Sequence, residues 1–218
     1  VVMSGRPLDL SWEDQNIPAI VQAWHLGSKS GDAIAQVLYG DYNPSGKLTM
    51  SFPRNVGQVP VYYNFKNTGR PSTSIEQVTN SGYADVENSP LYSFGYGLSY
   101  TEFKYSDFEI SSSNMTKDSK INASIRVTNT GKFKGEEVVQ LYLRDIVGSI
   151  ARPMKELKGF KKIELNPGES KIVNFEIENS LLEFYSYNNI WESEPGKFHV
   201  FIGTDSNVKD YKEFYLTD

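Results

Sequence analysis

The amino-acid sequence predicts a mixed fold, in which a partial α/β segment with a parallel sheet precedes an all-β sandwich of the fibronectin type III-like or immunoglobulin-like kind. Two observations lead to this prediction. Residues 1–40 alternate apolar runs of strand length with a helical pattern, as in an open parallel sheet. Residues 101–218 contain seven short strand-like runs separated by turn residues, at the spacing of a β-sandwich.

The expected α/β segment begins with two apolar runs and ends with a helix. Residues 1–5 (VVMSG) and 19–27 (AIVQAWHLG) have strand length and end at glycine, as strands buried on both faces do. Between them, Ser11 is placed to cap a short helical turn, with Asp14 three residues later. Residues 31–40 (GDAIAQVLYG) predict a short amphipathic helix that stops at its final glycine.

Residues 41–64 (DYNPSGKLTMSFPRNVGQVPVYYN) fit neither a helix nor a central strand. Pro44, Pro53 and Pro60 interrupt the hydrogen bonding that either structure requires. Aromatic and aliphatic residues nevertheless occur throughout, so a disordered linker is excluded. We interpret this segment as an extended interdomain strap, in which residues 47–52 form an edge segment and whose packing partners lie mostly outside the chain.

The predicted sandwich strands alternate apolar and polar residues. The clearest example places Ile121, Ala123, Ile125 and Val127 on one face of a strand. Between the first two strands, residues 112–119 (SSNMTKDS) predict a polar loop. Because the chain has no Cys, the antibody-type disulfide is excluded and the fibronectin variant is favoured. The predicted strands are residues 103–111, 120–129, 137–145, 155–165, 170–178, 197–204 and 210–217.

The composition excludes several functional classes. Without Cys there is no thiolate nucleophile and no zinc–thiolate site, and the two histidines, His25 and His199, are too few for a His-based metal site. We expect His199 to be a solvated residue of a sandwich strand. The net charge of −5 and the scattered basic residues argue against nucleic acid as a partner, and no apolar run approaches the ~20 residues of a membrane helix. The sequence therefore predicts no metal, no cofactor, no nucleic-acid partner and no membrane insertion.

Few residues point to chemistry. The adjacent acids Glu136 and Glu137 fall on a predicted strand, where neighbours face opposite sides, so they are not expected to act on one substrate. His25 is placed at the carboxyl end of a predicted parallel strand, before the glycine-bounded loop 27–31 and a helix start, where ligands bind in open α/β sheets. The alternative is that Trp24 and His25 only pack against a neighbouring domain.

Several irregular motifs occur in a fixed order: GRPLDLSW, AWHLGSKSGDAIAQVLYGDYNPSGKLTMSFPRNVGQVPVYYN, NTGRP, SPLYSFGYGLSYTEFKYSDF, GEEVVQLYLRD and RPMKELKGFKKIELNPGES. This series resembles the C-terminal half of glycoside hydrolase family 3 enzymes of the β-glucosidase type. The resemblance covers essentially the whole chain. It divides the chain into residues 1–60, the C-terminal part of the family's α/β sandwich domain; residues 61–100, an interdomain linker or strap; and residues 101–218, the fibronectin type III-like domain.

The resemblance implies a periplasmic or secreted, exo-acting enzyme that hydrolyses terminal β-linked sugars with retention, using two carboxylates about 5–5.5 Å apart. The family's nucleophilic Asp lies in an N-terminal barrel and its acid/base Glu lies upstream of the GRPLDL-like strand. No catalytic residue is therefore assigned in this chain. A chain that opens on an apolar run is expected to be a fragment, inactive alone, with its sandwich bracing the missing barrel and α/β domains.

The resemblance and the strap suggest Trp24, His25, Tyr63 and Arg70 as substrate-binding residues. Family members commonly have Gly-Gln-Glu-Gly-Gly where residues 27–31 here read GSKSG, so side-chain contacts of that loop do not carry over. Two further expectations remain open. The truncated lobe, residues 1–40, is expected to self-associate or to be partly disordered. Alternatively, the chain is a non-catalytic carbohydrate-binding or adhesion module that uses surface aromatics, namely Tyr185, Tyr187 and Trp191.

Overall fold

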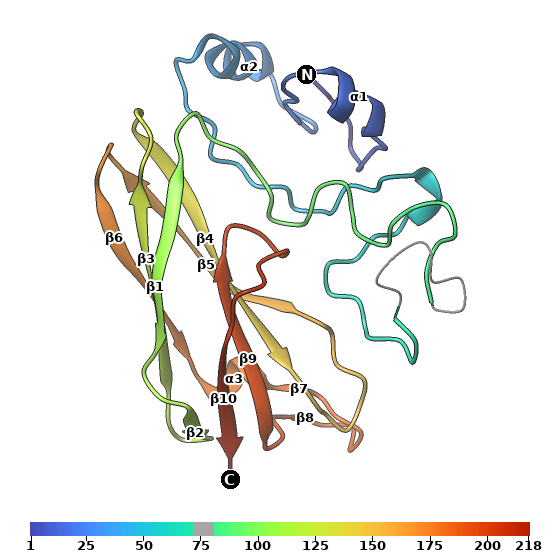
Figure 1. Ribbon diagram of the computed structural model, residues 1–218, viewed down its shortest axis with the longest axis vertical. Helices are drawn as coiled ribbons and strands as arrows, with labels where there is room; N and C mark the ends of the chain where they lie inside the picture. Colours follow the sequence, from blue (N-terminus) through green and yellow to red (C-terminus); the bar gives the residue numbers. More distant parts are fainter. Residues whose placement is uncertain (72–80) are drawn as a thin grey trace.

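The computed structural model describes residues 1–71 and 81–218 (Figure 1). A β-sandwich begins at residue 103 and extends to the C-terminus. The preceding residues form a lobe with two helices at one end of the sandwich and a long irregular path along its side, so the N-terminus and the C-terminus lie at opposite ends of the molecule (Figure 1). This arrangement confirms the predicted fold class, a partial α/β segment followed by a β-sandwich.

The sandwich consists of two sheets. The first has the order β1-β3-β6 and the second the order β2-β10-β9-β4-β5. Strand pairs are antiparallel, except that β2 is parallel to β10. All seven predicted strands are present, with bounds within two residues of those predicted. The strands are β1 (Phe103–Ile110), β2 (Asn114–Thr116), β3 (Ile121–Asn129), β4 (Gly135–Asp145), β5 (Glu156–Leu165), β6 (Ser170–Ile177), β9 (Gly196–Gly203) and β10 (Lys212–Thr217).

The core lies between these two sheets. The four residues predicted to point inward from β3 are all buried, and they belong to one apolar cluster with residues of β4, β6, β9 and β10. Burying an aliphatic side chain stabilises the fold by roughly 1.5–3 kcal/mol. The alternation along β3 therefore determines which of its faces meets the opposite sheet.

The predicted polar loop at residues 112–119 is wrong in part. Residues Asn114–Thr116 form β2, which pairs with β10 at the edge of the larger sheet. Met115 is 1% exposed and is part of the core. A strand of three residues with one apolar side chain is too short to give a periodic signal, and its pairing partner β10 lies far away along the chain.

A short helix and a two-stranded hairpin complete the sandwich at the end away from the lobe (Figure 1). The helix α3 (Asn179–Leu182) precedes β7 (Phe184–Tyr185), which pairs with β8 (Trp191–Glu192).

The lobe contains α1 (Ser11–Asn16) and α2 (Ser30–Tyr39), and α2 ends at Gly40 in the left-handed conformation, as predicted. The predicted cap at Ser11 is wrong. Ser11 lies inside α1, and its hydroxyl donates to the Arg54 carbonyl oxygen at 2.7 Å instead. The hydroxyl thus ties the lobe to the strap rather than closing a helix end.

The two strands predicted in the lobe are reduced to one parallel bridge, between Val2 and Gln22. The Val2 amide donates to the Val21 carbonyl, and the Ala23 amide donates to the Val2 carbonyl, each at 2.8 Å. Within residues 1–71 and 81–218 no further strand flanks this bridge. The apolar runs are therefore extended, but they lack the neighbours that would make them regular strands.

The strap pairs with a later part of the chain, contrary to the expectation that its partners lie mostly elsewhere. Residues 47–52 run antiparallel to residues 91–96 and share four backbone hydrogen bonds of 2.7–2.8 Å at Leu48 and Phe52. Phe52 is only 1% exposed. A 3₁₀ turn, η1 (Val56–Gln58), follows. Other apolar side chains of the strap remain exposed: Met50, Val56, Val59 and Tyr62.

Among the described residues, no helix has the length and apolar character needed to cross a membrane.

Candidate functional site

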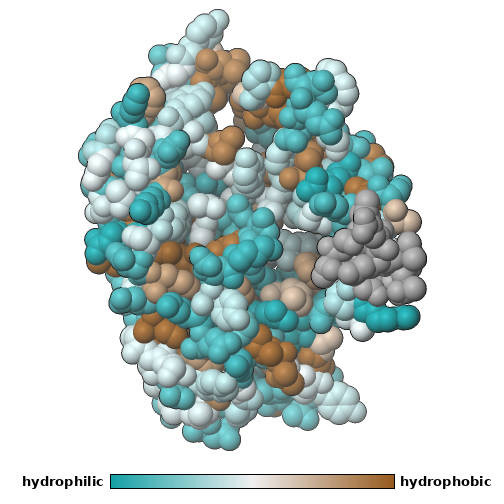
Figure 2. Space-filling view, viewed as in Figure 1, coloured by the Kyte–Doolittle hydropathy of each residue, from teal (hydrophilic) through white to brown (hydrophobic). Residues whose placement is uncertain are grey.

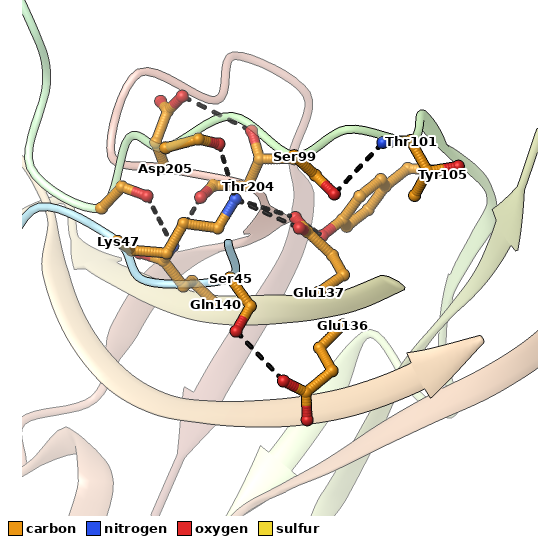
Figure 3. Close-up of polar contacts among 12 residues, drawn as sticks. Ser45, Lys47, Ser99, Thr101, Tyr105, Glu136, Glu137, Gln140, Thr204 and Asp205 are labelled. Carbon is orange, nitrogen blue, oxygen red and sulfur yellow. Dashed lines mark hydrogen bonds and ion pairs between the residues drawn. The ribbon is translucent and has the colours of Figure 1, made fainter. Parts of the chain in front are cut away.

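Buried polar groups gather where the strap crosses β4, and we call this set the junction cluster: Lys47, Tyr105, Glu137 and Gln140 (Figure 3). The Lys47 Nζ lies 3.1 Å from Glu137 Oε2 and also donates to the Gly97 carbonyl at 3.0 Å. The two side chains are 12% and 3% exposed. Because each charge is largely removed from water, each depends on the other for compensation.

Tyr105 completes the environment of the buried carboxylate. Its hydroxyl donates to Glu137 Oε1 at 2.9 Å, and Figure 3 shows the Lys47 ammonium and this hydroxyl converging on the Glu137 side chain. Burial, and then the negative charge of Glu137, raise the pKa of Tyr105 far above its ordinary value. The phenol therefore stays protonated and acts as a fixed hydrogen-bond donor.

Gln140 joins three segments at the same place. Its Nε2 donates to the Gly95 carbonyl at 3.1 Å and to the Thr204 carbonyl, and its Oε1 accepts from the Tyr142 hydroxyl. Gly95 has a φ of +82°, and an added Cβ there would lie 2.2 Å from Gln140 Oε1. Glycine is therefore required both by the backbone and by the close approach of the amide.

Glu136 and Glu137 face opposite sides of β4, as predicted (Figure 3). Glu136 lies 2.8 Å from Lys162 Nζ and accepts a hydrogen bond from Ser45 at 3.1 Å. The hydrogen bond from Lys162 lowers the pKa of Glu136. Each carboxylate is matched to its own lysine, so the pair holds the strap in place and does not form an acid/base couple.

A second cluster is aromatic and lies where the lobe meets the strap. Phe52 lies between Trp24 and Tyr92, with ring centroids at 5.8 and 6.2 Å, and Tyr92 stacks on Tyr96 at 5.4 Å. The Tyr92 hydroxyl donates to Asp14 at 2.6 Å. Burial and this carboxylate raise the pKa of Tyr92 above its ordinary value. Trp24 has a φ of +52°, a backbone conformation that costs roughly 1–2 kcal/mol for a residue other than glycine.

The four residues suggested as substrate contacts lie in different surroundings. Trp24 belongs to the aromatic cluster, and the neighbouring His25 is exposed with its imidazole against Gly5. Tyr63 stacks on Phe94 at 4.3 Å, and its hydroxyl accepts from the Leu157 amide at 3.2 Å, so it packs on the sandwich. Arg70 is exposed. A substrate contact by any of the four remains a prediction.

Within the described ranges, no three His, Asp or Glu side chains come close enough together to share a metal ion.

Two family models match the chain. "Glycosyl hydrolase family 3 C-terminal domain" matches residues 1–100, and "Fibronectin type III-like domain" matches residues 137–206. The chain belongs to glycoside hydrolase family 3. The junction cluster therefore lies at the meeting point of the two modules that characterise the C-terminal part of this family.

Members of family 3 match the chain along nearly its whole length. A "Periplasmic beta-glucosidase" of Salmonella typhimurium is 55% identical over 94% of the chain and 27% of its own length. A "Beta-xylosidase" of Formosa agariphila is 42% identical over 100% of the chain and 29% of its own length. The crystal structure of a Listeria innocua β-glucosidase in complex with glucose is 39% identical, with a TM-score of 0.91 over 99% of this chain and 30% of that one. The chain thus spans less than a third of the length of these relatives.

Sequence reasoning missed the junction cluster. Lys47 lies in a proline-rich stretch, and Glu137 was considered only as one half of an adjacent pair of acids. A signal for it lies on β4, where Glu137 and Gln140 flank the apolar pair Val138 and Val139, and buried polar residues of that kind require partners.

Proposed function

We propose that this chain works as the C-terminal part of an exo-acting, retaining β-glucosidase-like enzyme that hydrolyses terminal β-linked sugars in the periplasm. The similarity to β-glucosidases over 94–99% of the chain carries this proposal. The similarity to a β-xylosidase leaves glucosides and xylosides as the two candidate substrate classes. The name of the Salmonella relative supports the periplasmic location.

We further propose that residues 101–218 brace the lobe and take no part in the chemistry. The strap is held to β4 by the Lys47–Glu137 ion pair, and the segment that pairs with the strap is held there by the Gln140 hydrogen bond to Gly95. The adjacent carboxylates on β4 are directed to different lysines, which supports a structural role for this surface. The catalytic carboxylates would then come from parts of the enzyme that correspond to the remaining length of its relatives.

Chromogenic β-glucosides and β-xylosides test this proposal. The 218-residue chain is expected to be inactive, and a longer gene product that includes it is expected to release the chromophore with retention of configuration. Turnover that copurifies with the isolated chain would contradict the inactive-brace proposal. A longer product that hydrolyses neither substrate would contradict the assignment to β-glucosidase-like chemistry.

The substrate-binding prediction is tested in the longer enzyme. Arg70→Ala is expected to raise KM with little change in stability, because Arg70 is exposed. Tyr63→Ala is expected to raise KM and also to lower the melting temperature, because Tyr63 packs on Phe94. A KM that is unchanged in both variants would remove these two residues from the substrate site.

Exposed aromatic residues on the β7–β8 hairpin support a second candidate function, carbohydrate binding away from any catalytic centre. Tyr185, Tyr187 and Trp191 are 49%, 78% and 69% exposed, and exposed aromatic rings can stack on sugars. Affinity electrophoresis in gels with soluble β-glucans tests this idea. Retardation that is lost in Trp191→Ala would support it, and unretarded migration of the wild-type chain would contradict it.

A further inference from the structure

A cavity of about 700 Å³ lies between the strap and one end of the sandwich. Its volume falls within the range of small-molecule sites. Part of its wall comes from the strap and the loop after it, through Tyr62, Tyr63, Phe65 and Tyr83. The space-filling view shows a hollow in the surface between the sandwich and the path of the strap (Figure 2). Three of these four aromatic side chains are more than 40% exposed, so their rings are accessible from the cavity mouth.

The opposite wall comes from the sandwich and carries positive charge. Arg144 of β4, Lys155 and Lys209 all line the cavity. Arg144 is half-buried, and its guanidinium makes no hydrogen bond or ion pair with the described residues. Lys209 is exposed and likewise has no partner within the described ranges. A half-buried guanidinium without a partner has unused donors and is favourable for an anion.

Lys155 adds a constrained ammonium to this wall. Its Nζ donates to the carbonyl oxygens of Ser206 and Val208 and lies 4.2 Å from the centre of the Phe201 ring. Burial, followed by the nearby positive charge of Lys209, lowers the pKa of Lys155 to about 8. An anion in the cavity would relieve this unfavourable burial of positive charge.

Few negative groups offset these cations. Glu87 lines the cavity but lies 3.5 Å from the Arg54 guanidinium. The negative charge of Asp205 raises the pKa of Lys155, but this effect is smaller than those of burial and of Lys209. His199 is directed to Glu213, with 3.0 Å between Nε2 and the carboxylate. Among the described residues that line the cavity, positive charges therefore outnumber negative ones, in a chain whose net charge is −5.

We propose that this cavity binds a small six-membered ring that bears a carboxylate. The carboxylate would pair with Arg144, whose planar fork matches a carboxylate geometrically, and Lys155 would support the charge from the side. The ring would lie against the tyrosines of the strap, since both pyranose and aromatic rings stack on such side chains. Two classes of compound combine such a ring with a carboxylate: uronic acids and aromatic carboxylic acids.

Isothermal titration of the chain with D-glucuronate, with benzoate and with D-glucose tests the proposal. At least one of the two carboxylates is expected to bind, and the better ligand identifies the source. Glucose, which lacks the carboxylate, is expected to bind at least about tenfold more weakly. No binding of either carboxylate, or binding of glucose as tight as that of the better carboxylate, would overturn the proposal.

A substitution in the cavity wall and a matched substitution outside it test whether the carboxylate binds in the cavity. Arg144→Gln is expected to weaken carboxylate binding about tenfold or more, since a charged hydrogen bond is lost. Lys132→Gln, which removes an exposed charge that does not line the cavity, is the matched control and is expected to change nothing. Equal affinities of wild type and Arg144→Gln would contradict the site.

If circular dichroism shows that Arg144→Gln is unfolded, amide chemical shifts of the wild-type chain replace it. Ligand-induced shifts are then expected at residues of the cavity wall, including Asn207 and Tyr211. Shifts confined to residues outside the wall would overturn the proposal.

Discussion

At the scale of single residues, the buried ion pair between Lys47 and Glu137 needs explanation. Removing two charges from water costs several kcal/mol per ion, and the mutual attraction compensates only where the remaining polar atoms also have partners. Those partners are present here, because Tyr105 donates to the carboxylate and the Gly97 carbonyl accepts from the ammonium. The pair therefore specifies where the strap sits on β4 more than it stabilises the chain.

Removing one member of this pair is expected to be costly. Glu137→Ala leaves the Lys47 ammonium buried and uncompensated, and we expect the free energy of unfolding to fall by about 3–5 kcal/mol. Replacing both residues with apolar ones, Lys47→Met with Glu137→Leu, is expected to recover most of this loss. Urea unfolding measures both. As a control, Lys134→Ala removes an exposed ion pair with Glu164 and should leave stability nearly unchanged. Equal losses in Glu137→Ala and Lys134→Ala would contradict the argument.

Because its amine is buried, Lys155 is expected to make the free energy of unfolding depend on pH. Burial lowers its pKa in the folded chain to about 8, below the ordinary value of 10.5. Below pH 8 the amine is protonated in both states, and the burial penalty applies in full. Between pH 8 and 10.5 the folded chain binds fewer protons than the unfolded chain, so the free energy of unfolding rises with pH, by at most about 1.4 kcal/mol per unit.

The comparison with Lys155→Met isolates this effect, because the variant has no titrating amine at that position. Unfolding by urea from pH 7 to 10.5 is expected to give a wild-type-minus-variant difference that increases with pH. A difference that is flat or that decreases over this range would show that the amine is not penalised by burial.

At the scale of elements, the strap is an irregular segment that contacts both the segment at residues 91–96 and the sandwich strand β4. Its residues 47–52 pair with residues 91–96, and both stretches then contact β4 through Lys47 and Gly95. Its prolines prevent it from continuing as a strand, so side-chain contacts supply the order that a longer ladder would supply elsewhere. The side chains are therefore closely packed where the strap crosses β4.

A glycine pair tests this packing. Gly95 and Gly168 both have positive φ, but an added Cβ meets Gln140 at Gly95 and nothing within 4 Å at Gly168. Gly168→Ala is expected to cost only backbone strain, about 1–2 kcal/mol, whereas Gly95→Ala is expected to cost clearly more, because Gln140 must also move. Thermal unfolding of the two variants measures the difference. Equal losses would mean that the Gln140 contact adjusts without cost.

Individual elements also show which structural features could be predicted from the sequence and which could not. Alternation predicted β3 and its buried face because the information is contained in consecutive residues. The strap pairing was missed, since it joins Leu48 to Tyr96 and leaves no local pattern. His199 was expected to be solvated, but its side chain is 13% exposed because Tyr211 stacks on it at 4.0 Å. The junction cluster is likewise made from residues that are distant along the chain.

At the scale of the whole molecule, the lobe and the sandwich differ in how well they bury their apolar residues. The sandwich has one continuous core, whereas neither α1 nor α2 contains a buried residue. Trp12, Leu38 and Tyr39 are 65%, 57% and 85% exposed. Exposed apolar side chains of this size are typical of surfaces that meet another protein segment.

We therefore expect the isolated chain to self-associate through the lobe. Sedimentation velocity at increasing concentration should show a rising average mass, and the double variant Leu38→Glu with Tyr39→Glu should remain monomeric over a wider range. Phe160→Glu, a change at an exposed apolar residue on the sandwich, serves as the control. A monodisperse monomer at all concentrations would contradict this expectation.

The route by which the strap meets the sandwich also determines how tension would pass through the molecule. The chain enters the sandwich at β1, an edge strand that could be unzipped one hydrogen bond at a time. A pull from the N-terminus is intercepted earlier, at Lys47 and at Gly95, and is transferred to β4, which lies between β9 and β5. An inner strand has hydrogen-bonded neighbours on both sides, so two ladders must break before it leaves the sheet. The contacts at Lys47 and Gly95 thus transfer the force to β4 before it reaches the edge strand β1.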